Sequence, residues 1–590
     1  MKTLPMKSKD SAAPPASYAD RFDPITASVV EHGLLSVTDE MATVVVSTAY
    51  SPLVRDAFDF TVALCNPRGE MVVQGVGMAI HLGALPTSVE AILRRFGGKL
   101  RAGDAVIVND AYEGGMHLPN VVLLTPLLAT GELLGYAVVM AHHTDVGGHV
   151  PGSVAVNSRE IFAEGLRIPP MILERDGKRN EVLLELIERN VRVPRDFFGD
   201  LESQLSACRV ADKRLAALVN RYGNAVVQTT MDQLLDRAER MARAEIAALP
   251  DGAYTFEDFL DNDGMDGPPQ RLFVTVHIEG DEMTADFTGT AAQVPTAINA
   301  PLAYSRSAFY LSVRSIMSPD IPNNAGFFRP LHMIAPEGTL VNPRFPGAVG
   351  AMGVTGYRVT DCIFGALAKA APHLTRAASE GGTTRYTFAA NVDGKPSILS
   401  EALAGAWGGH SRLDGVDGVA NIAANMSNSP VEMVESTYPV MVEEYGYEPD
   451  SEGPGRRRGG LGVRRTIRVL APEGGMLQLR SGRASQPPWG AAGGGNGTCC
   501  QNLLNPGTPN ERRLRGLETI HVAGGTVYRH VTPGAGGHGA PDTREPALVA
   551  RDVRDGKISV QRARDVYRVS LSAGGIVDET ETAKLRMAER

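Results

Sequence analysis

The sequence predicts an α+β protein, a large multi-layer fold of mixed sheets with a central helical block and a glycine-rich, β-containing C-terminal region. Three observations support this. Apolar residues recur with a helical period in some segments and alternate in others. Two long helical patterns lie next to each other in mid-chain, and glycine-rich loops separate short strands from about residue 340 onward. A chain of 590 residues is also long enough for roughly three to four structural units.

These patterns divide the chain into five regions. They are a disordered tail (1–20), an N-terminal α/β region (21–175), a helical block (176–250), a mixed α/β region (251–400) and a glycine-rich, β-rich region with a short C-terminal helix (401–590). In the second region, Asp23 and Pro24 are typical of a helix N-terminus. Asn66-Pro67-Arg68-Gly69 then separates two alternating apolar runs, which predicts a β-hairpin. A further helix and three strands follow.

The later regions are assigned on the same grounds. Residues 180–223 and 226–249 carry apolar residues at helical spacing, and Pro250 ends the second run. Glu279-Gly280-Asp281 is a turn inside a predicted hairpin, and two apolar segments after it predict buried helices. The segment SVQRARDVYRVSL (559–571) predicts a short helix near the C-terminus.

Composition argues against several classes of function. The net charge of −9 disfavours binding to nucleic acid or to an anionic membrane surface. The sequence contains no run of 18 apolar residues, so no transmembrane helix is expected. The first residues lack the apolar stretch of a signal peptide. The five cysteines form no CxxC pair, which suits a reducing cytoplasm. The P-loop pattern GxxxxGK[ST] is absent, so we do not expect this chain to bind ATP through one.

Metal-ligating residue types gather in three segments before residue 150: VRDAFDF (54–60), NDAYEGGMHLPN (109–120) and AHHTDVGGH (141–149). Each segment lies where a strand meets a loop, and such junctions often display functional side chains. Imidazole and carboxylate ligands suit Zn²⁺, Mn²⁺ or Fe²⁺. Neighbouring strand residues face opposite sides, so His142 and His143 are not expected to enter one site together. The spacing matches no compact zinc motif, and a solvated polar loop would fit the same residues.

Longer motifs resemble the hydantoinase B/oxoprolinase family almost end to end. They include NDAYEGGMHLPNVVLLTP, AHHTDVGGHVPGS, DFTGTAAQVPTAINAP, SEGPGRRRGGLGVRR and VTPGAGGHGAPDTREPALVARDVRDGKIS. The resemblance implies a B-type subunit of an ATP-dependent cyclic amide hydrolase that opens a hydantoin, 5-oxoproline or lactam ring. It also implies a hetero-oligomer, in which an A-type subunit of the actin-like ATPase fold uses ATP to phosphorylate the substrate.

Two alternatives remain open. The same motifs resemble large subunits of acetone and acetophenone carboxylases, which implies a ketone substrate and carboxylation in place of ring opening. A third possibility is a non-catalytic scaffold for the ATPase subunit, although the cluster of metal-ligating residue types argues against it.

The resemblance also implies a set of metal ligands. One divalent transition metal (Zn, Mn or Fe) would be bound first by Asp59, His117 and His142, and then by Asp56 and Asn120. Asp56 stands where glutamate is more usual in the family. Asn120 stands where the family has aspartate, and a neutral amide binds a hard cation more weakly than a carboxylate does.

Further polar residues are assigned supporting roles. His143, Asp145 and His149 are expected to orient ligands, contact substrate or relay protons, and they are our candidate catalytic residues. The arginines of GRRRGG (455–460) would either bind a phosphate or carboxylate, or lie in a solvated turn.

Overall fold

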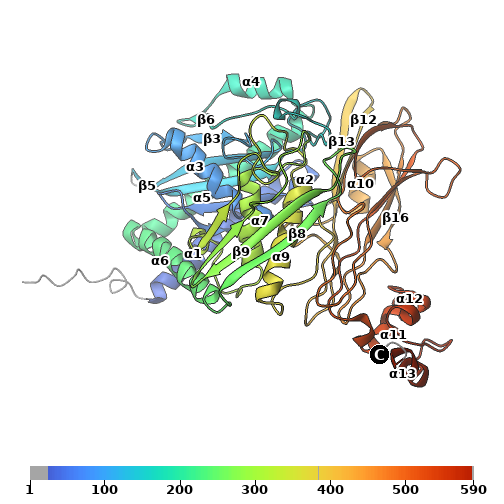
Figure 1. Ribbon diagram of the computed structural model, residues 1–590. Helices are drawn as coiled ribbons and strands as arrows, with labels where there is room; N and C mark the ends of the chain where they lie inside the picture. Colours follow the sequence, from blue (N-terminus) through green and yellow to red (C-terminus); the bar gives the residue numbers. More distant parts are fainter. Residues whose placement is uncertain (1–23, 130, 383, 588–590) are drawn as a thin grey trace, which may run out of the picture.

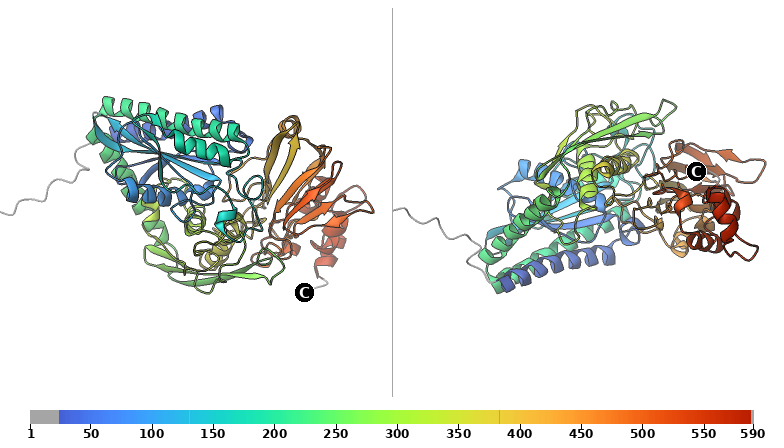
Figure 2. Two further views of the ribbon diagram at one scale, coloured as in Figure 1. Left: turned by 90° about the horizontal axis from the view of Figure 1, so that it is seen from above. Right: turned by 60° about the horizontal axis from the view of Figure 1, so that its bottom comes forward.

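The computed structural model describes residues 24–129, 131–382 and 384–587, and it has the predicted α+β architecture (Figure 1). The predicted disordered tail at 1–20 lies outside these ranges. The described residues form an N-terminal sheet flanked by helices, a central sheet with helices against it, and two C-terminal sheets beside each other (Figure 2). No helix in these ranges is long and apolar enough to cross a membrane.

The N-terminal sheet has seven strands in the order β2-β1-β5-β4-β3-β6-β7, and all neighbours are antiparallel. The strands are β1 (Phe60–Cys65), β2 (Met71–Gln74), β3 (Ala105–Val108), β4 (Asn120–Ala129), β5 (Glu132–His142), β6 (Met171–Arg175) and β7 (Lys178–Arg179). The predicted hairpin is confirmed: Gly69 has a φ of 85°, and its N–H donates to the Asn66 carbonyl at 2.9 Å.

Helices cover both faces of this sheet. On one face lie α1 (Pro24–Thr48), α5 (Pro194–Tyr222) and α6 (Asn224–Ile246); on the other lie α3 (Ala84–Phe96) and α7 (Leu302–Arg314). The short helices α2 (Pro52–Arg55) and α4 (Glu181–Asn190) lie before β1 and after β7. Successive side chains of β5 point to opposite faces of the sheet. Val139 and Ala141 pack with α1 and α5, whereas Val138 and Met140 pack in the core on the opposite face.

The central sheet has the order β11-β10-β9-β8, and α9 packs against β8 and β9. Its elements are β8 (Gly252–Leu260), β9 (Gln270–Glu279), β10 (Glu282–Asp286), α8 (Ala325–Phe328), β11 (Leu331–Ile334) and α9 (Gly353–Ala370). The predicted hairpin at residues 279–281 and the two buried helices, α7 and α9, are therefore confirmed.

The C-terminal sheets are β13-β12-β18-β21 and β16-β17-β22-β19-β20, which share one apolar core. Their elements, with the neighbouring two-stranded sheet and helix, are β12 (Thr384–Val392), β13 (Lys395–Leu403), β14 (Gly405–Ala406), β15 (Asp417–Val419), α10 (Val431–Thr437), β16 (Val440–Tyr447), β17 (Val463–Val469), β18 (Gly475–Arg480), β19 (Gln501–Leu504), β20 (Arg512–Arg513), β21 (Leu517–Val522) and β22 (Val527–Val531). The expected boundary at residues 400/401 falls inside β13, whose partner strand β12 also pairs with the distant β18.

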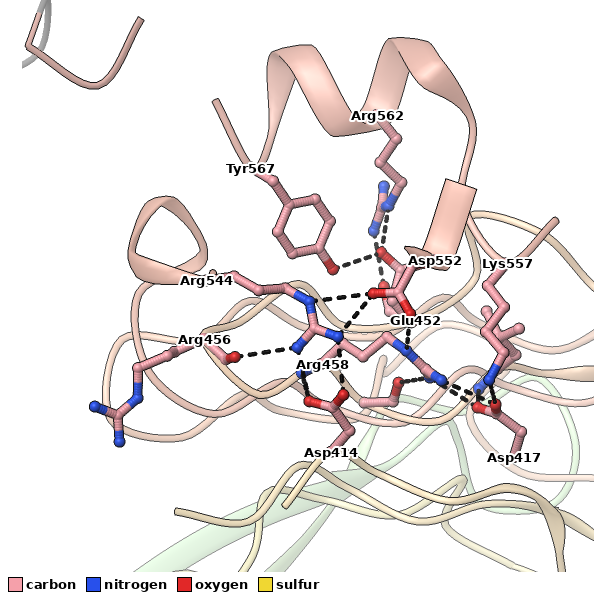
Figure 3. Close-up of polar contacts among 12 residues, drawn as sticks. Asp414, Asp417, Glu452, Arg456, Arg458, Arg544, Asp552, Lys557, Arg562 and Tyr567 are labelled. Carbon is pink, nitrogen blue, oxygen red and sulfur yellow. Dashed lines mark hydrogen bonds and ion pairs between the residues drawn. The ribbon is translucent and has the colours of Figure 1, made fainter. Parts of the chain in front are cut away.

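The chain ends in α11 (Pro546–Arg554), α12 (Val560–Asp565) and α13 (Glu579–Met587), not in one helix. The helix predicted over 559–571 stops at Asp565, because Tyr567 and Val569 turn into a small core with Val549. Figure 3 shows the buried ion pairs that attach this segment to the glycine-rich region. The two shortest contacts of Arg544 here are to Asp414 and Asp552, both at 2.7 Å.

Arg458 of GRRRGG belongs to the same network. It is buried and lies 2.8 Å from Asp417, which also pairs with Lys557 at 2.9 Å (Figure 3). Of the two sequence interpretations, binding to a carboxylate describes this arginine, because its guanidinium is paired with the mostly buried carboxylate of Asp417. The solvated turn does not describe it, since Arg458 is buried.

Candidate active site

Three strand ends at one edge of the N-terminal sheet bring most of the predicted site together. Asn120 begins β4 and His142 ends β5, and the antiparallel register pairs them directly. Asp59 precedes β1, and its carbonyl oxygen accepts from the His142 N–H at 3.0 Å. His117 is joined to this edge by a turn in which its carbonyl oxygen accepts from the Asn120 N–H at 3.0 Å. Residues from three distant segments therefore become neighbours.

The side chains of these residues line one small cavity of about 30 Å³, room for roughly one water molecule. Its lining residues are almost completely buried, and we call it the closed cavity. The wall is completed by helices α7 and α9 and by the C-terminal sheet. Its other polar members are His81, Tyr304, Tyr357, Arg385 and Arg480. Arg385 on β12 and Arg480 on β18 are directly paired across the two strands, so both side chains face the cavity.

Hydrogen bonds fix which nitrogen of two imidazoles faces the cavity. His117 Nδ1 lies 3.2 Å from the Gly350 carbonyl oxygen, which only accepts, so Nδ1 carries the proton. His81 Nδ1 lies 3.0 Å from Thr61 Oγ1, whose own proton goes to the Phe60 carbonyl at 2.8 Å, so this Nδ1 also donates. In both rings the lone pair is then on Nε2, as a metal-ligating imidazole requires.

Arg385 holds the third imidazole and the carboxylate. Its guanidinium donates to His142 Nε2 at 2.9 Å and to Asp59 Oδ2 at 3.1 Å. Because guanidinium has no acceptor, the His142 lone pair must be on Nε2. Asp59 Oδ1 and His142 Nδ1 are buried without a hydrogen-bond partner among the described residues. The positively charged group that contacts His142 and Asp59 is therefore the Arg385 guanidinium.

Burial sets the charges of the site. It lowers the pKa of His81 and of His117 to about 3, and that of His142 well below the usual value, so all three rings are neutral near pH 7. Burial raises the pKa of the Asp59 carboxyl, and the charge of Arg385 opposes that rise. Burial beside Arg385 lowers the pKa of Arg480 to about 10. When Asp59 is ionised, the positive charges of the two guanidinium groups outnumber the one negative charge of the carboxylate.

The donor chemistry fits a divalent transition metal, since neutral imidazoles and a carboxylate with an oxygen unpartnered among the described residues are its usual ligands. As the side chains now stand, no three His, Cys, Asp or Glu groups in the described ranges are gathered around one point. In this arrangement Arg385 contacts both Asp59 and His142.

Comparison with known proteins identifies the family. The family model described as hydantoinase B/oxoprolinase matches residues 23–541. The chain belongs to this family. A relative from Pseudomonas sp. strain NS671, the B subunit of a putative D-/L-hydantoinase, is 32% identical over 584 residues, which cover 96% of this chain and 98% of the relative.

Caprolactamase of Pseudomonas jessenii is also similar. Its β subunit is 32% identical over 585 residues, covering 96% of this chain and 99% of that protein. The crystal structure of this ATP-dependent enzyme matches with a TM-score of 0.90 and 30% identity, over 96% of this chain and 100% of that one. A nucleotide-free acetone carboxylase structure matches with a TM-score of 0.88 at 19% identity, over 97% and 83% of the chains, which shows a shared fold.

Asp56, the remaining residue of the metal prediction, lies apart from the cavity of this family member. Its carboxylate forms an ion pair with the adjacent Arg55 at 2.9 Å and is partly exposed to solvent. It ends α2 as the C-cap residue, three positions before Asp59. Four of the five predicted ligands are thus together, and Asp56 is not among them.

The three candidate catalytic residues also lie outside the cavity. His143 faces the opposite side of the sheet from His142, where its Nε2 contacts Gln204 at 3.0 Å. This divergence follows from the alternation of side chains along β5. Asp145 is buried and accepts from the backbone of Gly147 and Gly152, both at 2.9 Å, so it shapes the loop.

His149 lies on the surface of that loop. Its ring bonds the Ala163 carbonyl at 2.9 Å and Asn157 at 3.3 Å. The three residues therefore have structural partners of their own, which favours a structural role over the catalytic role that the sequence predicts for them.

Sequence reasoning missed several cavity residues. Of these residues, His81 is the one that the sequence could have indicated, because it is a histidine at the start of the family-like motif HLGALPTSV. Arg385 and Arg480 carry no local signal, since they meet only through the pairing of β12 with β18. Glu164 was missed for the same reason: its carboxylate accepts from the N–H of Gly350 at 2.7 Å, and thereby holds the carbonyl that contacts His117.

Proposed function

We propose that this chain is the B-type subunit of an ATP-dependent cyclic amide hydrolase, and that the closed cavity is its catalytic centre. The observation that carries the proposal is the convergence of Asp59, His117, His142 and Asn120 on one cavity with Arg385 and Arg480. The subunit relationship of the hydantoinase and caprolactamase relatives supports an A-type partner. In this proposal the partner phosphorylates the amide oxygen of the ring, and this chain completes the reaction.

Asp59, His117 and His142 would hold a divalent transition metal, with Asn120 as a weaker fourth group. Bound there, such an ion would supply Lewis acidity and lower the pKa of a water molecule. The imidazoles are ready for this role because burial keeps them neutral, so no proton has to leave them first. Arg385 would have to release Asp59 and His142 when the ion binds.

The two arginines would then bind the phosphoryl group. A guanidinium presents paired N–H donors that match phosphate oxygens, and Arg385 and Arg480 lie side by side on neighbouring strands. A phosphoryl group carries negative charge, which would offset both the arginines and the metal. His81 would accept a proton at Nε2, since its Nδ1 donates to Thr61 and the lone pair is on Nε2, which lies 3.5 Å from Asn120 Nδ2.

The chemistry balances with two water molecules. One adds to the carbon that bears the phosphorylated oxygen; both of its protons pass to the ring nitrogen as the ring C–N bond breaks, leaving an acyl phosphate and a free amine. The second water releases inorganic phosphate and a carboxylate. A closed cavity suits this sequence, because bulk water would hydrolyse the phosphorylated amide before the ring opens.

Co-expression with the A-type subunit would test the proposal. The purified complex should consume ATP and open at least one of a hydantoin, 5-oxoproline or a lactam, with ring-opened product detected by mass spectrometry. Metal analysis of the same complex should find about one Zn, Mn or Fe per chain, as one catalytic site requires. Carboxylated product from a ketone and bicarbonate, with no ring opening, would refute the hydrolase proposal. A metal-free active complex would refute the metal site.

A further inference from the structure

The closed cavity is too small for any substrate of the proposed reaction. Its volume of about 30 Å³ holds one water molecule, whereas a cyclic amide is several times larger. The cavity residues are also almost completely buried, with His81 1% and His142 3% exposed. A substrate must therefore reach the site through a wall that moves.

A much larger open cleft lies on the other side of one thin wall. It has a volume of about 850 Å³ and lies between the N-terminal sheet, α7 and the segment 404–428. Met426 lines both the cleft and the closed cavity. Residues 76–80 run between the two spaces: Gly77 and Ala79 line the cleft, whereas Met78 and Ile80 line the cavity.

This wall is built to move. Met78 and Met426 are unbranched, flexible side chains that can change rotamer without breaking a strong hydrogen bond. Two hydrogen bonds join the segments of the wall: Asn425 Nδ2 donates to the Gly77 carbonyl oxygen at 3.0 Å, and the Ile80 N–H donates to the Ala423 carbonyl oxygen at 2.7 Å. Asn425 has a φ of 55°, a left-handed conformation that costs free energy in a residue with a side chain. Release of the Asn425 hydrogen bond would let the Met426 side of the wall relax, while the bond from Ile80 to Ala423 keeps the other end attached.

The charge of the cleft indicates which ligand it takes. No Asp or Glu of the described ranges lines it, and Arg314 is its one Lys or Arg lining residue within those ranges. The Arg314 guanidinium donates to the uncharged carbonyl oxygens of Ser318 at 2.9 Å and Ile321 at 2.7 Å. The carboxylate of Glu245, which does not line the cleft, also acts on it electrostatically. Gln74, also in the wall, has a buried side-chain oxygen without a hydrogen-bond partner in the described part of the chain. An anionic, phosphorylated small molecule with an amide N–H fits these groups.

We propose that the cleft is the binding site through which a phosphorylated substrate reaches the closed cavity, and that Met78, Met426 and the Asn425–Gly77 hydrogen bond form its gate. This inference rests on the proposed function for the identity of the ligand. The existence of the gate does not, because a small reagent entering the cavity would take the same route.

Thiol labelling of the full-length chain tests the gate without substrate, partner or metal. Met352→Cys places a thiol in the closed cavity, and its modification by iodoacetamide is followed by peptide mass spectrometry. Asn425→Ala should raise the labelling rate about five-fold, because one neutral hydrogen bond no longer holds the wall closed. Val76→Trp or Val419→Trp, two independent ways to narrow the cleft, should lower that rate several-fold.

The native thiols supply the controls. Cys65, Cys208 and Cys362 are buried and line neither the cleft nor the closed cavity, so they report opening by unfolding. The proposal predicts that the thiol introduced at position 352 reacts faster than all three and alone responds to the cleft variants. It is overturned if this thiol reacts at the rate of the buried native thiols, or if neither tryptophan variant slows it.

The preference of the cleft for an anion is tested with iodoacetate, a charged reagent of nearly the same size as iodoacetamide. The ratio of iodoacetate to iodoacetamide labelling at position 352 should fall in Arg314→Gln and stay unchanged in Arg515→Gln, which alters an exposed arginine outside the cleft. An unchanged ratio in Arg314→Gln would overturn the anion assignment. If the gate is confirmed but the complex opens no ring, only the proposed function has failed.

Discussion

Replacing Glu164 with glutamine is predicted to remove a pH dependence of folding that this one carboxyl imposes. Glu164 is 1% exposed, and it accepts from the N–H groups of Val349 at 3.0 Å and Gly350 at 2.7 Å. Burial raises its pKa to about 8 from the usual 4.5, although the two backbone hydrogen bonds lower it. The folded protein therefore holds this proton more tightly than the unfolded chain does.

The sign follows from proton linkage. Because the folded pKa is raised, the stabilising contribution is complete below pH 4.5 and is lost as pH rises towards about 8. Each pH unit well inside that window costs about 1.4 kcal/mol, and the slope falls to half at the folded pKa, so about 2 kcal/mol of unfolding free energy is lost between about pH 6 and pH 8. Glutamine keeps one acceptor oxygen for the two amides and cannot ionise, so Glu164→Gln should lose this slope.

Urea unfolding of both proteins from about pH 6 to pH 8, followed by tryptophan fluorescence, measures the effect. The difference in unfolding free energy between variant and wild type should change by about 2 kcal/mol over the range in favour of the variant. Glu202→Gln, at an exposed glutamate on α5, is the matched control and should leave the slope unchanged. Parallel pH profiles of Glu164→Gln and wild type would refute the reasoning.

Three further outcomes are expected. Asp59→Asn should lower ring-opening turnover of the assembled complex by at least about 100-fold, whereas Asp56→Asn should change it little, as paired kinetic assays would show. Arg544→Met should lower the unfolding free energy by about 3–5 kcal/mol, because it leaves the buried carboxylate of Asp552 without this partner; urea unfolding measures the loss. His143→Ala should cost about 1–3 kcal/mol in the same assay while kcat stays within a few-fold of wild type.

Local patterns in the sequence were sufficient for many elements of the fold. The turn at Asn66–Gly69 and the helical spacing in α5 and α6 each reflect neighbours in the chain, so the hairpin and the helices are found where they were predicted. The pairing of strands distant in sequence left no such pattern. The region boundary expected at 400/401 therefore falls inside β13, and the three short helices at the C-terminus were reduced to one.

The candidate active site likewise contains residues that local sequence patterns predicted and residues that they did not. Asp59, His117, Asn120 and His142 were predicted because each lies at a strand end within a family-like motif, and the structure brings them to one cavity. Side-chain alternation separated His142 from His143, as expected from their adjacency.

The basic half of the cavity was not foreseen. Arg385 and Arg480 come from another sheet and approach only when the C-terminal region packs on the first. Glu164 does not line the cavity. It holds the Gly350 backbone, whose carbonyl oxygen contacts His117, and no residue pattern predicts such a contact.

The most direct test of the proposed catalytic centre compares two histidines in the assembled, partner-containing complex: His117 in the cavity and His149 on the neighbouring loop. Ring-opened product and ADP are measured together for His117→Ala and His149→Ala. We expect that His117→Ala still forms the complex and consumes ATP but yields no ring-opened product, while His149→Ala retains product formation. Full ring opening by His117→Ala, or its loss only in His149→Ala, would contradict the assignment of the cavity as the catalytic centre.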